Sequence, residues 1–100
     1  MSSIFAKKIV GIIIFLKHKT LINKLNDTRA SKNKYCIWGT NRPPKQKVDR
    51  IYFAVDGKVK GYFKIFKITE NEIRFYPESW QSIENGSNLK IIEGWRYYKE

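Results

Sequence analysis

The stretch RIYFAVDGKVKGYFKI, residues 50–65, decides the fold. In its first half Ile51, Phe53 and Val55 recur at every second position, which is the period of a β-strand with one apolar face. The alternation stops at Asp56-Gly57, a pair that is favoured in two-residue hairpin turns. The sequence therefore predicts a β-hairpin over residues 50–65 that turns at this pair.

Further short strands are expected toward the C-terminus. The return strand, residues 58–68, would place Val59, Phe63 and Ile65 on one side. Gly61 inside it indicates a bulge or a barrel corner. The remaining segments predict strands over residues 72–76, 89–94 and 94–99, and a helical turn over residues 77–83 with Trp80 and Ile83 facing inward.

Toward the N-terminus the spacing favours a helix. Residues 7–16 place Ile9, Ile12, Ile13 and Leu16 at helical intervals, which predicts a short buried helix, although β-branched side chains favour strands. The apolar run is far shorter than the ~20 residues of a membrane span, and no signal-peptide cleavage site follows it, so we expect a core element. The other segments predict a strand over residues 20–22, an exposed basic loop over 26–34, a strand over 35–38 and a loop over 39–47.

Together these segments predict an α+β, mainly β fold. The chain has 100 residues, which fits a single domain spanning residues 1–100. Several short strands and one helix favour a small curled sheet or partial β-barrel with a short N-terminal helix. The core is expected to contain Ile9, Ile13, Leu16, Ile51, Phe53, Val55, Phe63 and Ile73.

Positive charge is concentrated in the first half of the chain. The net charge is +11, and residues 1–50 carry twelve Lys or Arg against only Asp27 and Asp49. Residues 51–100 carry eight basic residues against seven acidic ones. An uneven basic field attracts polyanions, so the expected partner is nucleic acid first and an anionic membrane surface second.

Cysteine and histidine are too few for a disulfide or a zinc site. Cys36 is the only cysteine, which leaves it without an intramolecular partner and fits a reducing cytoplasm. Only Cys36 and His18 could act as soft metal ligands, so neither a metal nor another cofactor is expected. Cys36 is interpreted as a small core hydrophobe and His18 as a surface residue.

The segment before the hairpin combines an aromatic ring, small polar groups and positive charge. Trp38 could pack in the core or stack on a base. Its neighbours favour the second role, because Gly39 leaves room near the backbone and Thr40 and Asn41 offer groups that can read a base edge. Phosphate contacts are expected from Arg42, Lys45, Lys47 and Arg50.

A second aromatic and basic cluster, Trp95-Arg96-Tyr97, lies in the last expected strand. Strand geometry puts Trp95 and Tyr97 on one face and Arg96 on the other. The cluster could pack in the core or form a further contact with nucleic acid. The role of Lys19 and Lys24 also stays open. They could contact nucleic acid, or they could be solvated residues at the edge of a strand, where lysines prevent pairing with another chain. The candidate nucleic-acid site therefore also includes Lys19, Lys24, Trp95 and Arg96.

Several motifs resemble the PUA-like superfamily, in particular its ASCH and EVE branches. KVDRIYFAVDGKVKGYFKI, residues 47–65, is similar to a family pattern of a turn, a strand, a hairpin and a Gly-containing return strand, with Val48-Asp49 where the family has Gly-Asp. FAKKIVGIIIFLKHKT looks like the helix and basic stretch of ASCH domains, IWGTNRP like the Trp-Gly of EVE-type proteins, and GWRYYK like the closing aromatic strand. The resemblance implies a PUA-like fold and an association with RNA or modified bases.

The ASCH signature is matched only in part. Lys19 matches its Lys and Lys24 replaces its Arg, whereas Lys17 stands in place of its Gly and Ile22 in place of its Glu. Some ASCH relatives resemble small amidohydrolases that use a Lys, a Thr and a Glu. Because Ile22 takes the place of the acid, that activity is not carried over to this chain.

The expected function is therefore binding of nucleic acid, with RNA favoured over DNA, by a cytoplasmic monomer. Two other classes stay open. A metal-free ribonuclease using Lys, Arg and Tyr needs no special motif, although the sequence singles out no catalytic residue. A regulatory module could instead dock its basic half on an acidic protein partner.

Overall fold

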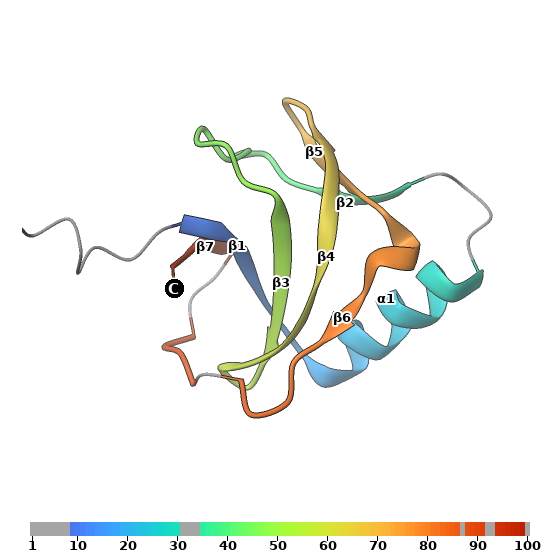
Figure 1. Cartoon of the computed structure of the whole chain (residues 1–100), viewed down its shortest axis with the longest axis vertical. Helices are drawn as coiled ribbons and strands as arrows, with labels where there is room; N and C mark the ends of the chain where they lie inside the picture. Colours follow the sequence, from blue (N-terminus) through green and yellow to red (C-terminus); the bar gives the residue numbers. More distant parts are fainter. Residues whose placement is uncertain (1–8, 31–34, 87, 92–93, 100) are drawn as a thin grey trace, which may run out of the picture.

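The computed structural model describes residues 9–30, 35–86, 88–91 and 94–99. These residues form a mainly β domain with one α-helix, as the sequence predicts (Figure 1). The elements, in chain order, are β1 (Ile9–Leu16), α1 (His18–Ala30), β2 (Cys36–Gly39), β3 (Arg50–Val55), β4 (Lys58–Ile68), β5 (Glu72–Phe75), the 3-10 turn η2 (Pro77–Ser79), β6 (Gln81–Ser82) and β7 (Trp95–Lys99).

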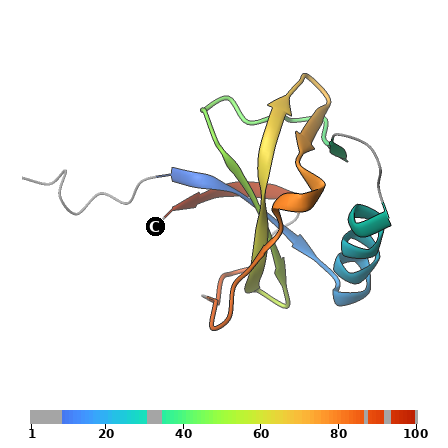
Figure 2. The same ribbon diagram turned by 45° about the vertical axis from the view of Figure 1, so that its right-hand side comes forward.

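The described strands form one mixed sheet in the order β2-β5-β4-β3-β1-β7, with β6 paired to β4. The neighbours β1 and β3 are parallel, and the other pairs are antiparallel. The sheet curls, and α1 lies to one side of it (Figure 2). Because β2 and β7 remain its two ends, the sheet is open, and the part of the expectation that pointed to a barrel is not met.

The β3–β4 hairpin is confirmed. Its strands pair Ile51 with Phe63 and Tyr52 with Tyr62. The turn residues Asp56 and Gly57 have φ angles of 52° and 79°, the left-handed conformations that favour this residue pair.

The bulge expected at Gly61 is also present. Phe53 pairs with Gly61 but the next residue, Ala54, pairs with Val59, so β4 has one extra residue at this point. A Cβ atom on Gly61 would collide with the indole of Trp80. The extra residue turns Val59 to the face opposite Phe63, which corrects the expectation that the two share a side.

Both faces of the central strands are buried. One face packs Ile51, Phe53 and Phe63 against α1 through Leu21, and the other packs Tyr52 and its neighbours. Of the expected core residues, Ile13, Ile51, Phe53, Val55, Phe63 and Ile73 are buried, and Ile9 and Leu16 are half-buried at the ends of β1.

The N-terminal helix expected over residues 7–16 is wrong, since Ile9–Leu16 form β1. This strand lies between β3 and β7 with both faces covered, so it is apolar throughout and shows no alternation. Its β-branched residues fit a strand better than a helix. As a core element, however, the segment is confirmed, because Ile12, Ile13 and Ile14 are buried.

The helix comes directly after this strand. The strand expected at residues 20–22 and the first part of the loop expected at 26–34 both belong to α1, and residues 31–34 lie outside the described part of the chain. The helix buries Leu21 and Thr28, with Leu25 half-buried between them. This apolar stripe is narrow, and Ile22 is apolar but exposed beside it, so the helical period is hidden in the sequence.

The C-terminal expectations are met in part. The expected helical turn is limited to η2, and Trp80 then packs against the Phe53 face while Ile83 packs against the Tyr52 face. Of the strand expected over residues 89–94, residues 89–91 are not a strand and residues 92–93 lie outside the described part of the chain, whereas Trp95–Lys99 form β7 as expected. Within the described residues, no helix is both long and apolar enough to cross a membrane.

Candidate nucleic-acid interface

A pocket of about 550 Å³ opens between the two ends of the sheet. One wall comes from β2 and the loop after it, and the opposite wall from the start of β7. The curl of the sheet therefore brings together the two aromatic clusters that the sequence singles out. The lining residues are Ile14, Phe15, Trp38, Gly39, Thr40, Asn41, Asn71, Gly94 and Trp95.

Trp38 is half-buried between the core and this pocket. Its ring lies 5.6 Å from that of Phe53, centroid to centroid, so one part of the indole is held by the core. The position of the next residue, Gly39, is open, because a Cβ atom there would meet nothing within 4 Å. The pair thus presents an aromatic surface next to accessible backbone.

Lys24 of α1 holds the outer edge of β2. Its Nζ donates a hydrogen bond to the Ile37 carbonyl at 3.1 Å and lies 5.5 Å from the centroid of the Trp38 ring. It therefore satisfies a carbonyl on an end strand of the sheet, which is the edge-guarding role left open by the sequence. Lys19, in contrast, is exposed on the helix and outside the pocket lining.

Trp95 and Arg42 form two reciprocal hydrogen bonds across the mouth of the pocket. The indole Nε1 donates to the Arg42 carbonyl at 2.7 Å, and Arg42 Nη2 donates to the Trp95 carbonyl at 3.0 Å. The guanidinium carbon lies 4.4 Å from the indole centroid, in the range of a cation–π contact. Trp95 is only 6% exposed, so it is mainly a core residue whose remaining surface lines the pocket.

Tyr97 fixes the same loop at a second point. Its hydroxyl oxygen accepts hydrogen bonds from the backbone N–H groups of Lys45 and Gln46, at 2.9 and 3.1 Å. Trp95 and Tyr97 pack edge to face, with their centroids 5.0 Å apart, on the same face of β7. The strand thus fixes the loop while the side chains of Lys45 and Lys47 remain exposed.

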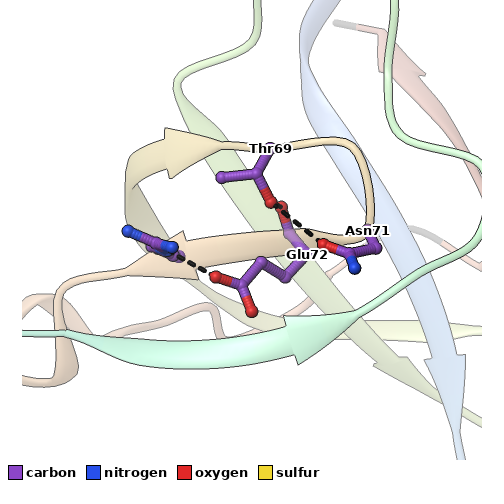
Figure 3. Close-up of polar contacts among 4 residues, drawn as sticks. Thr69, Asn71 and Glu72 are labelled. Carbon is purple, nitrogen blue, oxygen red and sulfur yellow. Dashed lines mark hydrogen bonds and ion pairs between the residues drawn. The ribbon is translucent and has the colours of Figure 1, made fainter.

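Asn71 is a lining residue that the sequence analysis missed. It lies in the turn between β4 and β5, where its carbonyl accepts a hydrogen bond from the Thr40 N–H at 3.0 Å. Figure 3 shows the Thr69 hydroxyl pointing to the Asn71 side-chain oxygen, 3.5 Å away. Only the tertiary contact with Thr40 brings Asn71 to the pocket, so nothing local in its turn sequence marks it.

Besides Lys19 and Lys24, two more predicted site residues lie outside both the pocket lining and the adjoining loop. Arg50 donates to the Tyr52 hydroxyl at 3.1 Å and its guanidinium lies 4.5 Å from the Tyr62 centroid, on the face of the sheet opposite Trp38. Arg96 points away from Trp95, with its guanidinium 5.8 Å from the Phe15 centroid. The candidate site therefore keeps Trp38, Gly39, Thr40, Asn41 and Trp95 in the pocket lining, with Arg42, Lys45 and Lys47 on the adjoining loop.

Comparison with protein-family models, with curated proteins and with solved structures finds no match for this chain. The resemblance to the PUA-like superfamily therefore stays a prediction. Among the residues that the structure describes, no three His, Cys, Asp or Glu side chains are grouped so that they could hold a metal ion. Cys36 is half-buried on β2 and packs against the core.

Proposed function

We propose that this protein binds single-stranded nucleic acid, RNA in preference to DNA, and takes one base into the pocket between the ends of its sheet. The observation that carries the proposal is the joint lining of this pocket by Trp38 and Trp95 together with Thr40, Asn41 and Asn71. The half-buried indole of Trp38 offers a stacking surface, Trp95 adds its remaining exposed edge to the opposite wall, and amides and hydroxyls can pair with a base edge.

The size and charge of the pocket region support the same ligand. A volume of about 550 Å³ lies within the range of small-molecule sites, which extends from ~300 to ~1,000 Å³. The loop at its mouth carries exposed Lys45 and Lys47, which can meet the phosphates on either side of an inserted base. The proposal includes a PUA-like type, which the sequence motifs imply, a cytoplasmic location, which the single cysteine favours, and a monomeric state.

Removal of the Trp38 ring tests the stacking role. Trp38→Ala should weaken binding of an RNA of about twelve nucleotides by ~1–3 kcal/mol, measured by fluorescence anisotropy. Trp80→Ala is the matched control, because Trp80 is also half-buried on the core but does not line the pocket. Equal losses in the two variants, or an unchanged affinity in a folded Trp38→Ala protein, would contradict the proposal.

The phosphate contacts are tested through salt dependence. Lys45→Ala and Lys47→Ala should each reduce the slope of log K against log salt by about 0.7, the value for one phosphate contact on a single strand. Trp38→Ala should leave the slope unchanged, because stacking releases no counterions. Lys90→Ala, an exposed lysine outside the loop, is the control and should not alter the slope.

A further inference from the structure

An aromatic ladder formed by Tyr35, Phe66 and Tyr76 covers the outer face of the β2–β5–β4 end of the sheet. Tyr35 and Phe66 stack with their centroids 5.3 Å apart and their planes 9° from parallel. Phe66 and Tyr76 meet edge to face, also at 5.3 Å. The guanidinium of Arg74 lies 5.0 Å from the Tyr35 centroid, so the ladder ends in a cation.

A second bulge in β4 places this ladder on the outside. Ile65 pairs with Phe75 and Lys67 pairs with Arg74, which leaves Phe66 as the extra residue between them. Ile65 and Phe75 belong to the inner core, whereas Phe66 contacts the outer rings of Tyr35 and Tyr76. The bulge thus directs a large aromatic side chain outward from a strand whose inner face is apolar.

The ladder and the pocket lie on opposite faces of the same end strand. In β2, Trp38 pairs with Ile73 on the inner face, and Ile37 pairs with Arg74 on the outer face. A strand of nucleic acid that leaves the pocket past Gly39 would pass around the edge of β2, where Lys24 holds the Ile37 carbonyl, before it reached the ladder. Helix α1 packs on the inner face through Leu21, and so does not cover the ladder.

The surface around the ladder is exposed and basic. Phe66 keeps 43% of its surface exposed and Ile37 keeps 44%. Lys64 and Lys67 are exposed beside Phe66 on β4. Glu72 is the one acidic residue within β2, β4 and β5, and its carboxylate is held by Arg74 Nε at 2.6 Å (Figure 3).

This combination fits a polyanion with flat rings better than a protein surface. Aromatic side chains beside lysines are the means by which sheet surfaces hold single strands, since bases stack while cations meet phosphates. Among the described residues Lys64 and Lys67 form no ion pair, so an apolar protein partner would have to bury both charges uncompensated. The hydrogen bond from Arg74 to Glu72 also raises the pKa of Arg74, so the guanidinium stays protonated over the Tyr35 ring while Glu72 balances its charge.

We propose that the Tyr35–Phe66–Tyr76 ladder is a second contact surface for single-stranded nucleic acid, used by nucleotides that flank the base in the Trp38 pocket. The proposal rests on the proposed function, because it extends the same ligand around the edge of β2. It implies that affinity depends on oligonucleotide length: a short strand fills the pocket, and only a longer one reaches Phe66.

The experiment compares Phe66→Ala with the parent protein on RNA oligonucleotides of about four and about twelve nucleotides, both within the site sizes of ~4–16 nucleotides found for OB folds. Phe66→Ala should weaken binding of the longer strand by about 5- to 150-fold, the loss expected for one stacked base, and leave the shorter strand unaffected. Phe66→Leu should lose as much, because it keeps an apolar side chain but no ring. Ile22→Ala removes an apolar residue of similar exposure, 42%, from α1 and should change neither affinity.

The outcomes separate this proposal from the proposed function. If Phe66→Ala binds both lengths like the parent while Trp38→Ala still weakens them, the ladder is not a contact surface and the pocket stands. If only Phe66→Ala weakens binding, the ladder stands and the pocket is not the site. If the parent protein forms dimers that Phe66→Ala abolishes, with RNA affinity unchanged, the ladder is an interface between copies and the proposal is overturned.

Discussion

The β3–β4 hairpin and the pocket between β2 and β7 are built by different kinds of contact. In the hairpin, neighbours in sequence pair with each other, and both faces are buried, with Ile51 fully buried on one side and Tyr52 on the other. In the pocket, Arg42 and Trp95 meet across 53 positions of the chain. The hairpin therefore stabilises the fold, while the open ends of the sheet leave half-buried side chains for a ligand.

The largest effect is expected at the centre of the hairpin. Phe53 is fully buried, and its ring contacts Trp38, Phe63 and Trp80. Phe53→Ala should lower the free energy of unfolding by ~3–5 kcal/mol, the usual cost of deleting a buried Phe, as measured by urea denaturation. A loss below ~1 kcal/mol would contradict the division between a stabilising hairpin and an adaptable pocket.

The bulge in β4 should give the next largest effect. Gly61→Ala adds a Cβ atom against the Trp80 indole and the Gln81 carbonyl, so the domain should lose ~1–3 kcal/mol of stability through overpacking. Gly39→Ala is the matched control, because a Cβ atom there meets no neighbour within 4 Å. Thermal melting of the two variants compares the two regions directly; similar melting temperatures would show that the bulge is not closely packed.

The same contrast explains what the sequence could predict. The hairpin, its turn and its bulge at Gly61 depend on local pairing, and each is visible in the spacing of residues 50–65. The strand Ile9–Leu16 was mistaken for a helix because a strand that is covered on both faces loses the two-residue alternation. In such a run Ile12 and Ile13 fit the helical spacing by chance, and only their β-branched side chains indicate the strand.

For the candidate site, the sequence predicts individual residues but not the way in which distant segments meet. Trp38, Gly39, Thr40 and Asn41 come from one segment and do line the pocket. Asn71 reaches it through a backbone contact with Thr40, which leaves no local signal. Trp95 is a candidate from its own aromatic and basic cluster, but its contact with Arg42 across the pocket could not be predicted. Charge alone misplaced Arg50, since the side to which a basic residue points is set by its position in the strand.

The smallest loss of stability is expected at Tyr97. This variant gives the most specific test of how the pocket differs from the hairpin. Tyr97→Phe removes the oxygen that accepts hydrogen bonds from the Lys45 and Gln46 N–H groups but keeps the ring that packs on Trp95. Both N–H groups are exposed and can turn to water, so the loss of stability should be only ~0.5–1.5 kcal/mol.

Without this anchor the loop should exchange its amide hydrogens faster at residues 45 and 46, and RNA affinity should fall because Lys45 and Lys47 are less well placed. Tyr98→Phe is the control, since Tyr98 packs on the opposite face of β7, against Tyr52. Hydrogen exchange and fluorescence anisotropy, measured on the same samples, test whether the fixed loop is needed for RNA binding. Faster exchange with unchanged affinity would mean that the loop binds RNA without being fixed by Tyr97. The contribution of β7 to the pocket would then be Trp95 alone.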